Sequence, residues 1–213
     1  VRMRYYNAGG GEAEMCGNGA RCFGNFAAAL LHHDKTAPLP FETMAGVVTA
    51  TFEKDGNVTV NLTNPHSMQL FVLNADPTVG ADVHFLNTGV PHAVAFLDKL
   101  EGLDISRLGA YLRYHDAFSP KGTNANFARI LSPGHIAIRT YERGVEDETL
   151  ACGTGMTACA LLHAVLTDAP TPIQVDVAGG DTLKVGFQRT GDRFTDVTLT
   201  GPADLVFTGD IQI

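Results

Sequence analysis

One short pattern occurs twice in this chain and limits what it can fold into. Residues 16–19 read Cys-Gly-Asn-Gly and residues 152–155 read Cys-Gly-Thr-Gly. Each copy runs into a long Ala-rich apolar segment, which extends to about His33 in the first case and about Leu166 in the second. Glycine permits a tight entry into a helix and a close approach of a ligand to the backbone. The pattern therefore predicts two helices that each begin at a cysteine.

A cysteine at the start of a helix has a particular chemistry. The first turn carries unpaired backbone N–H groups and a partial positive charge, so it binds carboxylates and lowers the pKa of a thiol. We expect Cys16 and Cys152 to act as a pair, one removing a proton from the α-carbon of an amino acid and the other returning one on the opposite face. The N–H groups that would bind the substrate carboxylate belong to Gly17, Asn18, Gly153 and Thr154.

The remaining pattern indicates the fold class. Both cysteine-led segments are apolar on most sides, which is typical of buried helices. A further amphipathic helix is predicted near residues 105–114, and strands are predicted at residues 1–6, 47–52, 58–62, 69–73, 83–87, 93–97, 126–131, 135–142, 173–177, 182–187, 194–200 and 205–211.

We therefore predict an α+β fold of two pseudo-symmetric lobes. Each lobe is a curled, mostly antiparallel sheet wrapped around a central buried helix, and the active site lies in the cleft between the lobes. The N-terminal lobe is expected to comprise residues 1–63 and 205–213, and the C-terminal lobe residues 64–204.

Composition excludes several classes of partner. The net charge is −8 and basic blocks are absent from the sequence, which argues against nucleic acid and anionic membranes. No signal peptide or membrane-length apolar run occurs, so we expect a cytoplasmic protein with reduced thiols and a small-molecule substrate. The chain starts at Val1, and we expect an N-terminal piece to be absent. The sequence does not fix the oligomeric state, and a homodimer is kept as the working expectation.

The cysteines and glycines also allow plainer interpretations. Cys22 and Cys159 are expected in the core, and the same assignment is the plain alternative for Cys16 and Cys152. The spacing of the cysteines does not complete a zinc set, so no metal is expected. Residues 153–158 match part of a dinucleotide fingerprint, but no strand leads directly into them. No cofactor is expected, and nothing around the lysines suggests a pyridoxal site.

Two loops carry further candidates. In residues 142–149, Arg143 could bind a carboxylate with two hydrogen bonds, and Glu142 could influence the proton of a thiol. An ordinary solvated loop remains open as the alternative. His92 follows Pro91 at a strand junction, where a lone histidine is usually structural.

These motifs carry a resemblance to a known family. Residues 7–22, Asn-Ala-Gly-Gly-Gly-Glu-Ala-Glu-Met-Cys-Gly-Asn-Gly-Ala-Arg-Cys, and residues 142–155, from Glu-Arg-Gly to Cys-Gly-Thr-Gly, resemble the two cysteine signatures of the diaminopimelate epimerases. The resemblance implies a two-lobed, cofactor-independent enzyme that interconverts LL- and meso-diaminopimelate for lysine and peptidoglycan synthesis.

The resemblance also implies roles for single residues. Cys16 and Cys152 would be the acid/base thiols, tuned by His92 and Glu142. The carboxylate at the reaction centre would bind the backbone of Gly17, Asn18, Gly153 and Thr154. The distal end of the substrate would be held by Asn7, Asn124, Glu142 and Arg143.

The chain departs from the family pattern in three places. A segment of several dozen residues that precedes Val1 in the family is missing, Val90 stands where the family usually has Asn before Pro-His, and residues 9–11 are Gly-Gly-Gly where Asp-Gly-Ser is common. The first two departures bear on substrate selectivity more than on the chemistry.

Two other functions are kept as hypotheses. A proline or hydroxyproline racemase shares the two-cysteine scheme, but its first signature usually has His in place of Asn18 and it lacks the loop at residues 142–144. A non-catalytic thiol-redox or ligand-binding protein is the alternative outside enzymes.

Overall fold

The computed structural model describes residues 1–6, 10–13 and 15–210. In chain order the elements are β1 (Tyr5–Tyr6), β2 (Glu12–Ala13), α1 (Gly17–Leu30), β3 (Leu39–Thr43), β4 (Gly46–Phe52), β5 (Val58–Asn61), β6 (His66–Asp76), β7 (Ala81–Asn87), β8 (Pro91–Phe96), α2 (Ile105–Arg113), η1 (Asp116–Phe118), β9 (Asn124–Ser132), β10 (His135–Glu142), β11 (Asp147–Thr149), α3 (Gly153–Thr167), β12 (Ile173–Asp176), β13 (Thr182–Thr190) and β14 (Arg193–Gly201).

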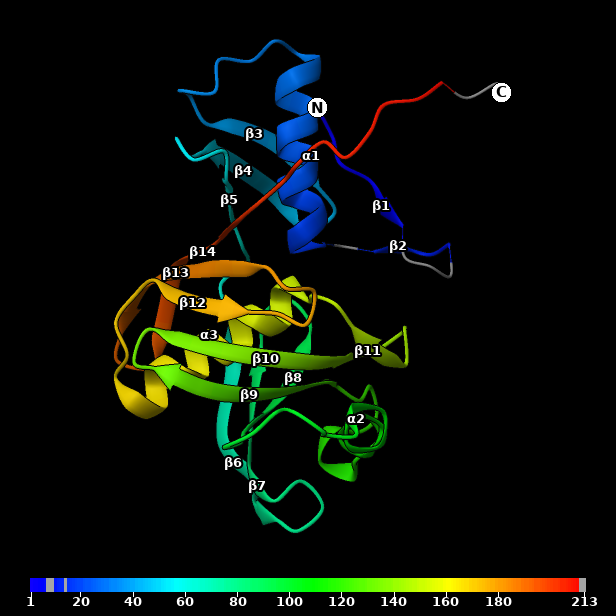
Figure 1. The fold of residues 1–213 in the computed structure, drawn as a ribbon, viewed down its shortest axis with the longest axis vertical. Coiled ribbons are helices and arrows are strands. Elements are labelled where there is room, and N and C mark those ends of the chain that lie inside the picture. The colour runs from blue at the N-terminus through cyan, green and yellow to red at the C-terminus, as the bar shows by residue number, and fades with distance from the viewer. Residues whose placement is uncertain (7–9, 14, 211–213) are drawn as a thin grey trace.

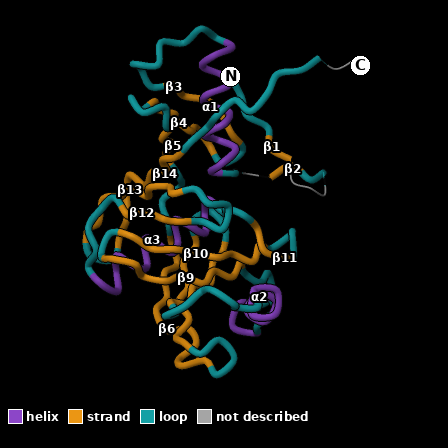
Figure 2. Tube along the Cα trace, viewed as in Figure 1, coloured by secondary structure: helices purple, strands orange, loops and turns teal. Residues whose placement is uncertain are grey.

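One sheet connects most of the described chain. Its strand order is β3-β4-β5-β14-β13-β12-β10-β9-β8-β7-β6, and β11 pairs with β10. The β8–β9 and β10–β12 pairs are parallel, whereas the other paired strands are antiparallel. Figure 1 shows α1 beside β3, β4 and β5 in the upper part of the molecule and α3 inside the strands of the lower part. Figure 2 separates the strands from the helices in the same view. The predicted α+β fold is confirmed.

The two cysteine-led helices differ in burial. Every residue of α3 from Gly155 to Ala164 is buried, and its side chains join the largest hydrophobic cluster. Helix α1 buries one face, through Ala20, Gly24, Ala27 and Ala28, and leaves Phe26 and Leu30 exposed. The prediction of a helix buried on most sides is therefore right for α3 and wrong for α1, because the strands that contact α1 cover a single face.

Local predictions had mixed outcomes. The strand predicted at residues 135–142 coincides with β10, and the predicted helix near 105–114 is α2. The strand predicted at residues 205–211 is wrong for its described part, since residues 202–210 form no strand and Leu205, Val206 and Phe207 are exposed. Strand β3, which contains Pro40, was not predicted. The division of the chain into lobes stays a prediction.

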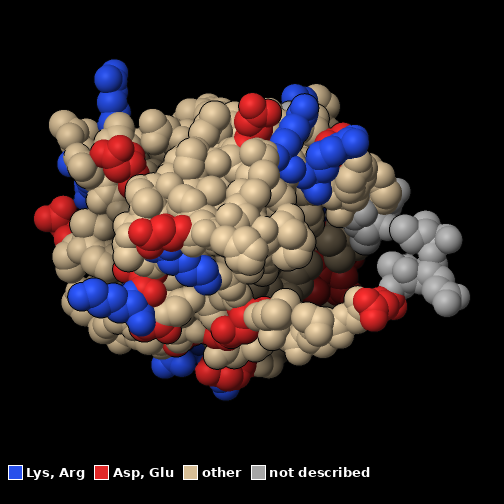
Figure 3. Space-filling model, turned by 90° about the horizontal axis from the view of Figure 1, so that it is seen from above, with Lys and Arg blue, Asp and Glu red and all other residues tan. Residues whose placement is uncertain are grey.

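Charged side chains are mixed on the surface. Figure 3 shows Lys and Arg interspersed with Asp and Glu on the face seen from above, where no extended basic patch forms among the described residues. None of the helices in the described part of the chain is long and apolar enough to span a membrane.

Candidate active site

The two cysteine-led helices meet at their N-termini. Cys16 and Cys152 are the N-cap residues of α1 and α3, and both have extended backbones. Gly17 and Gly153 lie back to back, so that a β-carbon on Gly153 would be 3.3 Å from the Cα of Gly17 and 3.2 Å from Leu199 Cδ2. Glycine suits this contact because a β-carbon would press on the facing helix end and on a core leucine.

A hydrogen bond joins the two cysteine loops. The Asn18 side-chain amide donates to the carbonyl of Ala151 at 3.2 Å, and Asn18 Oδ1 accepts from Arg21 Nη1 at 2.9 Å. Arg21 is buried, and its Nε donates to the carbonyl of Pro202. The side chain of Asn18 therefore holds the loop before one helix to the first turn of the other.

The electrostatics of Cys152 correct one expectation. Burial, together with the nearby carboxylate of Glu142, raises the pKa of the Cys152 thiol to about 12, although a hydrogen-bonding contact with Thr154 Oγ1 at 3.5 Å opposes the shift. The sequence predicted a lowered pKa from the helix N-terminus. Desolvation outweighs the helix field here because Cys152 is almost fully enclosed. Cys152 is therefore a thiol at neutral pH.

Cys16 lies in a more open position. Its side chain is half-buried, and its Sγ accepts a hydrogen bond from the Gly19 N–H at 3.4 Å. The Tyr5 hydroxyl forms a hydrogen bond with Cys16, and the charges of Cys16, Glu142 and Cys152 all raise the pKa of Tyr5. Both cysteines thus face the same small region, although they are 136 positions apart in the sequence.

Glu142 lies at the end of β10 beside Cys152. Its Oε2 accepts a hydrogen bond from Thr149 Oγ1 at 3.0 Å. Burial raises its pKa, and the hydrogen bond from Thr149 only partly opposes that shift. Glu142 is thus a half-buried carboxyl group next to a buried thiol.

His92 belongs to a buried polar cluster behind α3. Asn126 Nδ2 lies 3.1 Å from His92 Nδ1, and Thr140 donates to Asn126 Oδ1 at 3.0 Å. Burial lowers the pKa of His92 to about 3, helped by the charge of Arg143. His92 Nε2 has no hydrogen-bond partner among the described residues, and their contacts do not join His92 to either thiol. His92 is therefore a neutral imidazole.

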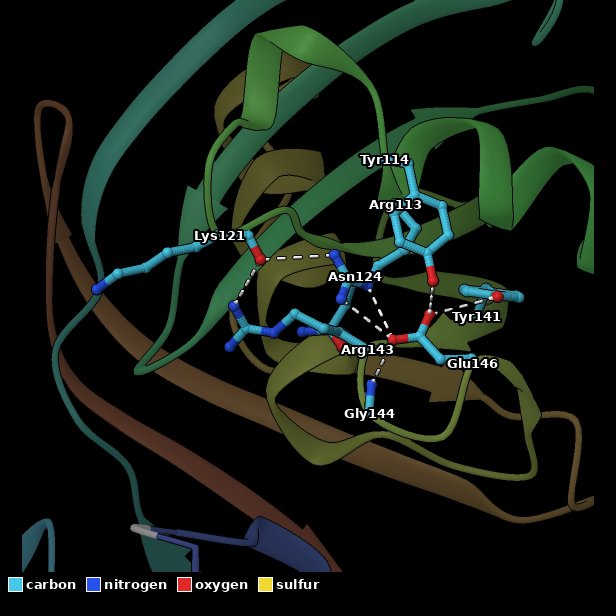
Figure 4. A network of polar contacts seen from close by, with 8 residues as sticks. All are labelled: Arg113, Tyr114, Lys121, Asn124, Tyr141, Arg143, Gly144 and Glu146. Atoms are coloured by element: carbon cyan, nitrogen blue, oxygen red, sulfur yellow. Dashed lines mark hydrogen bonds and ion pairs between the residues drawn. The ribbon is translucent and has the colours of Figure 1, made fainter. Parts of the chain in front are cut away.

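Asn124 is the first residue of β9 and Arg143 directly follows β10, and the two residues lie side by side (Figure 4). Asn124 Oδ1 accepts from the Arg143 N–H at 2.8 Å, and Asn124 Nδ2 donates to the carbonyl of Pro91 at 2.9 Å. The Arg143 guanidinium donates to the carbonyl of Lys121 at 3.3 Å. The amide of Asn124 is thus engaged with the protein, whereas Arg143 keeps other donors for a ligand.

A cavity of about 820 Å³ adjoins this site. Its lining includes Thr154, at the start of α3, and the basic residues Arg143 and Lys121. Val90 contributes an apolar wall, as do Met15 and Phe85. The cavity therefore has both a helix N-terminus and a guanidinium among its lining groups, and each of them can bind an anionic group of a ligand.

Comparison with known proteins identifies the family. A family model described as diaminopimelate epimerase matches residues 1–68 and 84–206. The diaminopimelate epimerase of a Hydrogenobaculum species is 42% identical over 210 residues, which cover 96% of this chain and 73% of that protein. The enzyme of Chlorobaculum tepidum is 40% identical over 214 residues, which cover 100% of this chain and 80% of that protein.

The chain belongs to the diaminopimelate epimerase family.

Solved structures support the fold of this epimerase family member. A phenazine biosynthesis protein of the PhzF family from Bacillus anthracis superposes with a TM-score of 0.69 at 15% identity, covering 94% of this chain and 77% of that one. A probable proline racemase from Agrobacterium radiobacter superposes with a TM-score of 0.65 at 19% identity, covering 90% of this chain and 66% of that one. At these identities the likeness shows the fold alone.

One expected site residue lies outside the described part of this epimerase chain, and one cysteine expected in the core is exposed. Asn7 is outside the described residues. Cys22, expected in the core, is exposed, whereas Cys159 is fully buried as predicted. The difference arises because Cys22 lies on the uncovered face of α1.

Sequence reasoning overlooked two residues at the site of this family member. Tyr5 contacts Cys16, and the buried Thr88 donates from Oγ1 to the carbonyl of Thr154 at 2.9 Å. Tyr5 belongs to a segment interpreted only as a strand, and Thr88 belongs to a turn. Neither residue type is distinctive enough at these positions to indicate a site.

Proposed function

We propose that this chain interconverts LL- and meso-2,6-diaminopimelate without a cofactor, by moving one α-proton between Cys16 and Cys152. The observation that carries the proposal is the contact between the N-termini of α1 and α3, each capped by a cysteine. That contact is typical of a site for one small anion between two acid/base groups.

The protonation state of Cys152 sets the starting roles in this mechanism. Because burial keeps Cys152 protonated, it serves as the acid in the first half-reaction, and Cys16 serves as the base. Cys16 takes the proton from the α-carbon, the electron pair is delocalised into the carboxylate, and Cys152 delivers its proton to the opposite face. The enzyme then carries a Cys16 thiol and a Cys152 thiolate. In the reverse reaction Cys152 is therefore the base and Cys16 the acid.

The carboxylate at the reaction centre binds the helix N-termini in this proposal. The N–H groups of Gly17, Asn18, Gly153 and Thr154 provide the donors. Each such donor contributes about 3 kcal/mol when negative charge develops in a site without water. The link from Asn18 to Ala151 keeps the two sets of donors together.

The distal end of the substrate binds across the cavity in this proposal. Arg143 contacts the distal carboxylate, and Glu142, Asn124 and Asn7 complete the pocket. The amide of Asn124 acts mainly by holding the Arg143 backbone, since both its polar atoms already have protein partners. Val90 offers no hydrogen bond, so the selectivity for the distal group depends on Arg143.

His92 and Glu142 adjust the two thiols in this proposal. The negative charge of Glu142 stabilises the protonated form of Cys152. His92 stays neutral and supports the wall behind α3 through Asn126. We place the reaction in the cytoplasm, in the synthesis of lysine and peptidoglycan precursors.

Turnover assays test the proposal. Purified protein is incubated with LL-diaminopimelate under reducing conditions, and the isomers are separated by chiral chromatography, with L-proline in a parallel assay. We expect meso-diaminopimelate to form from the first substrate and D-proline to be absent from the second. Turnover of proline without diaminopimelate would favour the racemase, and binding of diaminopimelate without turnover would favour the non-catalytic hypothesis.

A further inference from the structure

Glu146 is the centre of a hydrogen-bonded cluster behind Arg143 (Figure 4). Its backbone has a left-handed conformation, with φ of 59°, which folds the carboxylate back over its own loop. Oε1 accepts from the Gly144 N–H at 3.0 Å and from Arg113 at 3.1 Å, and Oε2 accepts from Tyr114 Oη at 3.1 Å. The Tyr141 hydroxyl donates to Oε2 at 3.4 Å. Glu146 thus ties the loop after Arg143 to the end of α2.

Arg113 and Arg143 lie close enough to repel each other. Both guanidinium groups donate to the carbonyl of Lys121, Arg113 at 3.5 Å and Arg143 at 3.3 Å. Burial lowers the pKa of Arg143, and the charge of Arg113 lowers it further, whereas Glu146 opposes the shift. Like charges at this separation are destabilising unless an anion stands beside them.

The Arg113 guanidinium is packed closely against two neighbours. Gly122 has φ of +65°, and a β-carbon there would collide with the Arg113 side chain. The Arg113 guanidinium also lies over the Tyr114 ring, 4.7 Å from its centroid. The position of Arg143 therefore depends on neutralising the charge of Arg113. Glu146 is the carboxylate that forms an ion pair with Arg113.

We propose that Glu146 is a positioning residue for Arg143: it neutralises Arg113, anchors the N–H of Gly144 and so directs the Arg143 guanidinium toward the distal carboxylate of the substrate. The inference rests on the proposed function, in which Arg143 binds that carboxylate. Glu146 itself does not line the cavity. It therefore affects binding of the distal end and leaves proton transfer at the cysteines largely unchanged.

Substitution of Glu146 tests this role. Since loss of a charged hydrogen-bonding partner weakens a site by an order of magnitude, Glu146→Ala should raise KM for diaminopimelate about tenfold and change kcat by less than about threefold. Glu146→Gln retains an oxygen for the Gly144 N–H and should show a smaller rise. If Glu146→Ala does not fold, Glu146→Gln and Arg113→Gln, which disturb the cluster from opposite sides, are compared with wild type instead.

The matched control is Glu148→Gln. Glu148 is in β11, two residues after Glu146, and its side chain is similarly exposed. It forms an ion pair with Arg139, with Nη2–Oε2 at 2.6 Å, and is not among the carboxylates paired with Arg113. The Glu148→Gln substitution should lower the melting temperature without changing KM for diaminopimelate. An equal rise of KM in Glu148→Gln, or a lower melting temperature with unchanged KM in the Glu146 variants, would overturn the proposal.

A double-mutant cycle shows whether Glu146 acts through Arg143. In an Arg143→Ala background, Glu146→Gln should have no further effect on substrate affinity, whereas additive effects would overturn the proposal. Affinity is measured by calorimetry and chemistry by α-hydrogen exchange. A wild type that binds but does not exchange would refute the proposed function and still leave the affinities to decide the role of Glu146, and a wild type that does neither would overturn both.

Discussion

Helices α1 and α3 begin in the same way and end in different surroundings. Each starts at a cysteine N-cap followed by Gly-x-Gly, and the two starts touch at Gly17 and Gly153. Further along, α3 is enclosed by strands, while α1 exposes Phe26 and Leu30. The two helices share only their first turns, which face the site, so the duplicated pattern reflects the chemistry. The burial of the rest of each helix depends on the strands beside it.

The largest expected difference between the helices is in stability. Leu161 on α3 is fully buried, so Leu161→Ala should lower the free energy of unfolding by about 2–5 kcal/mol. Phe26 on α1 is 60% exposed, so Phe26→Ala should change it by less than about 0.5 kcal/mol. Urea unfolding measures both. Equal losses would mean that α1 is covered in solution.

Acid pH should lower the free energy of unfolding through His92, which is buried behind α3. The folded protein keeps His92 neutral, with a pKa of about 3, whereas the unfolded chain takes up a proton near its ordinary value of about 6.5. Stability is therefore lost as pH falls from about 6.5 toward 3, at up to about 1.4 kcal/mol per pH unit from this group.

The matching variant is His92→Gln. Its unfolding free energy should depend less steeply on pH over the same window than that of wild type. Because burial also lowers the pKa of His84 and His163, a residual slope is expected in the variant. An unchanged slope would show that His92 is not held neutral.

The second glycine of each copy gives a smaller contrast. A β-carbon on Gly155 would collide with Asn126 Oδ1, whereas one on Gly19 would lie 3.1 Å from the flexible end of Met3. Gly155→Ala should therefore cost about 1–3 kcal/mol of stability, and Gly19→Ala less than about 1 kcal/mol because helix propensity offsets the contact. Thermal unfolding of the two variants measures both losses. A larger loss in Gly19→Ala than in Gly155→Ala would contradict the packing around Asn126.

The smallest perturbation is alkylation of the thiols, which compares the accessibility of the cysteines at α1 with that of the cysteines at α3. In native protein at mildly alkaline pH, iodoacetamide should modify the exposed Cys22 first and the half-buried Cys16 next. Cys152 and Cys159 should react only on unfolding, because burial raises the pKa of both thiols. Peptide mass spectrometry over time reports the order. Fast alkylation of Cys152 would contradict its enclosure.

The sequence predicts more of the site than of its surroundings. The N-caps at Cys16 and Cys152 follow from local glycine and helix patterns, and β10 follows from alternation, so these were found. The exposure of Cys22 depends on which strands reach α1, and a segment's own pattern does not reveal its neighbours. The raised pKa of Cys152 depends on enclosure by distant strands and on Glu142, and Tyr5 becomes noticeable only when β1 is placed beside Cys16.

The most direct test of the central claim follows the α-hydrogen of the substrate in deuterated water. Wild type should incorporate deuterium at the α-carbon while it interconverts the two isomers of diaminopimelate, and Cys16→Ala and Cys152→Ala should each lose interconversion. Wild-type protein that incorporates no deuterium, or a single-cysteine variant that still interconverts the isomers at the wild-type rate, would contradict a proton passed between two thiols.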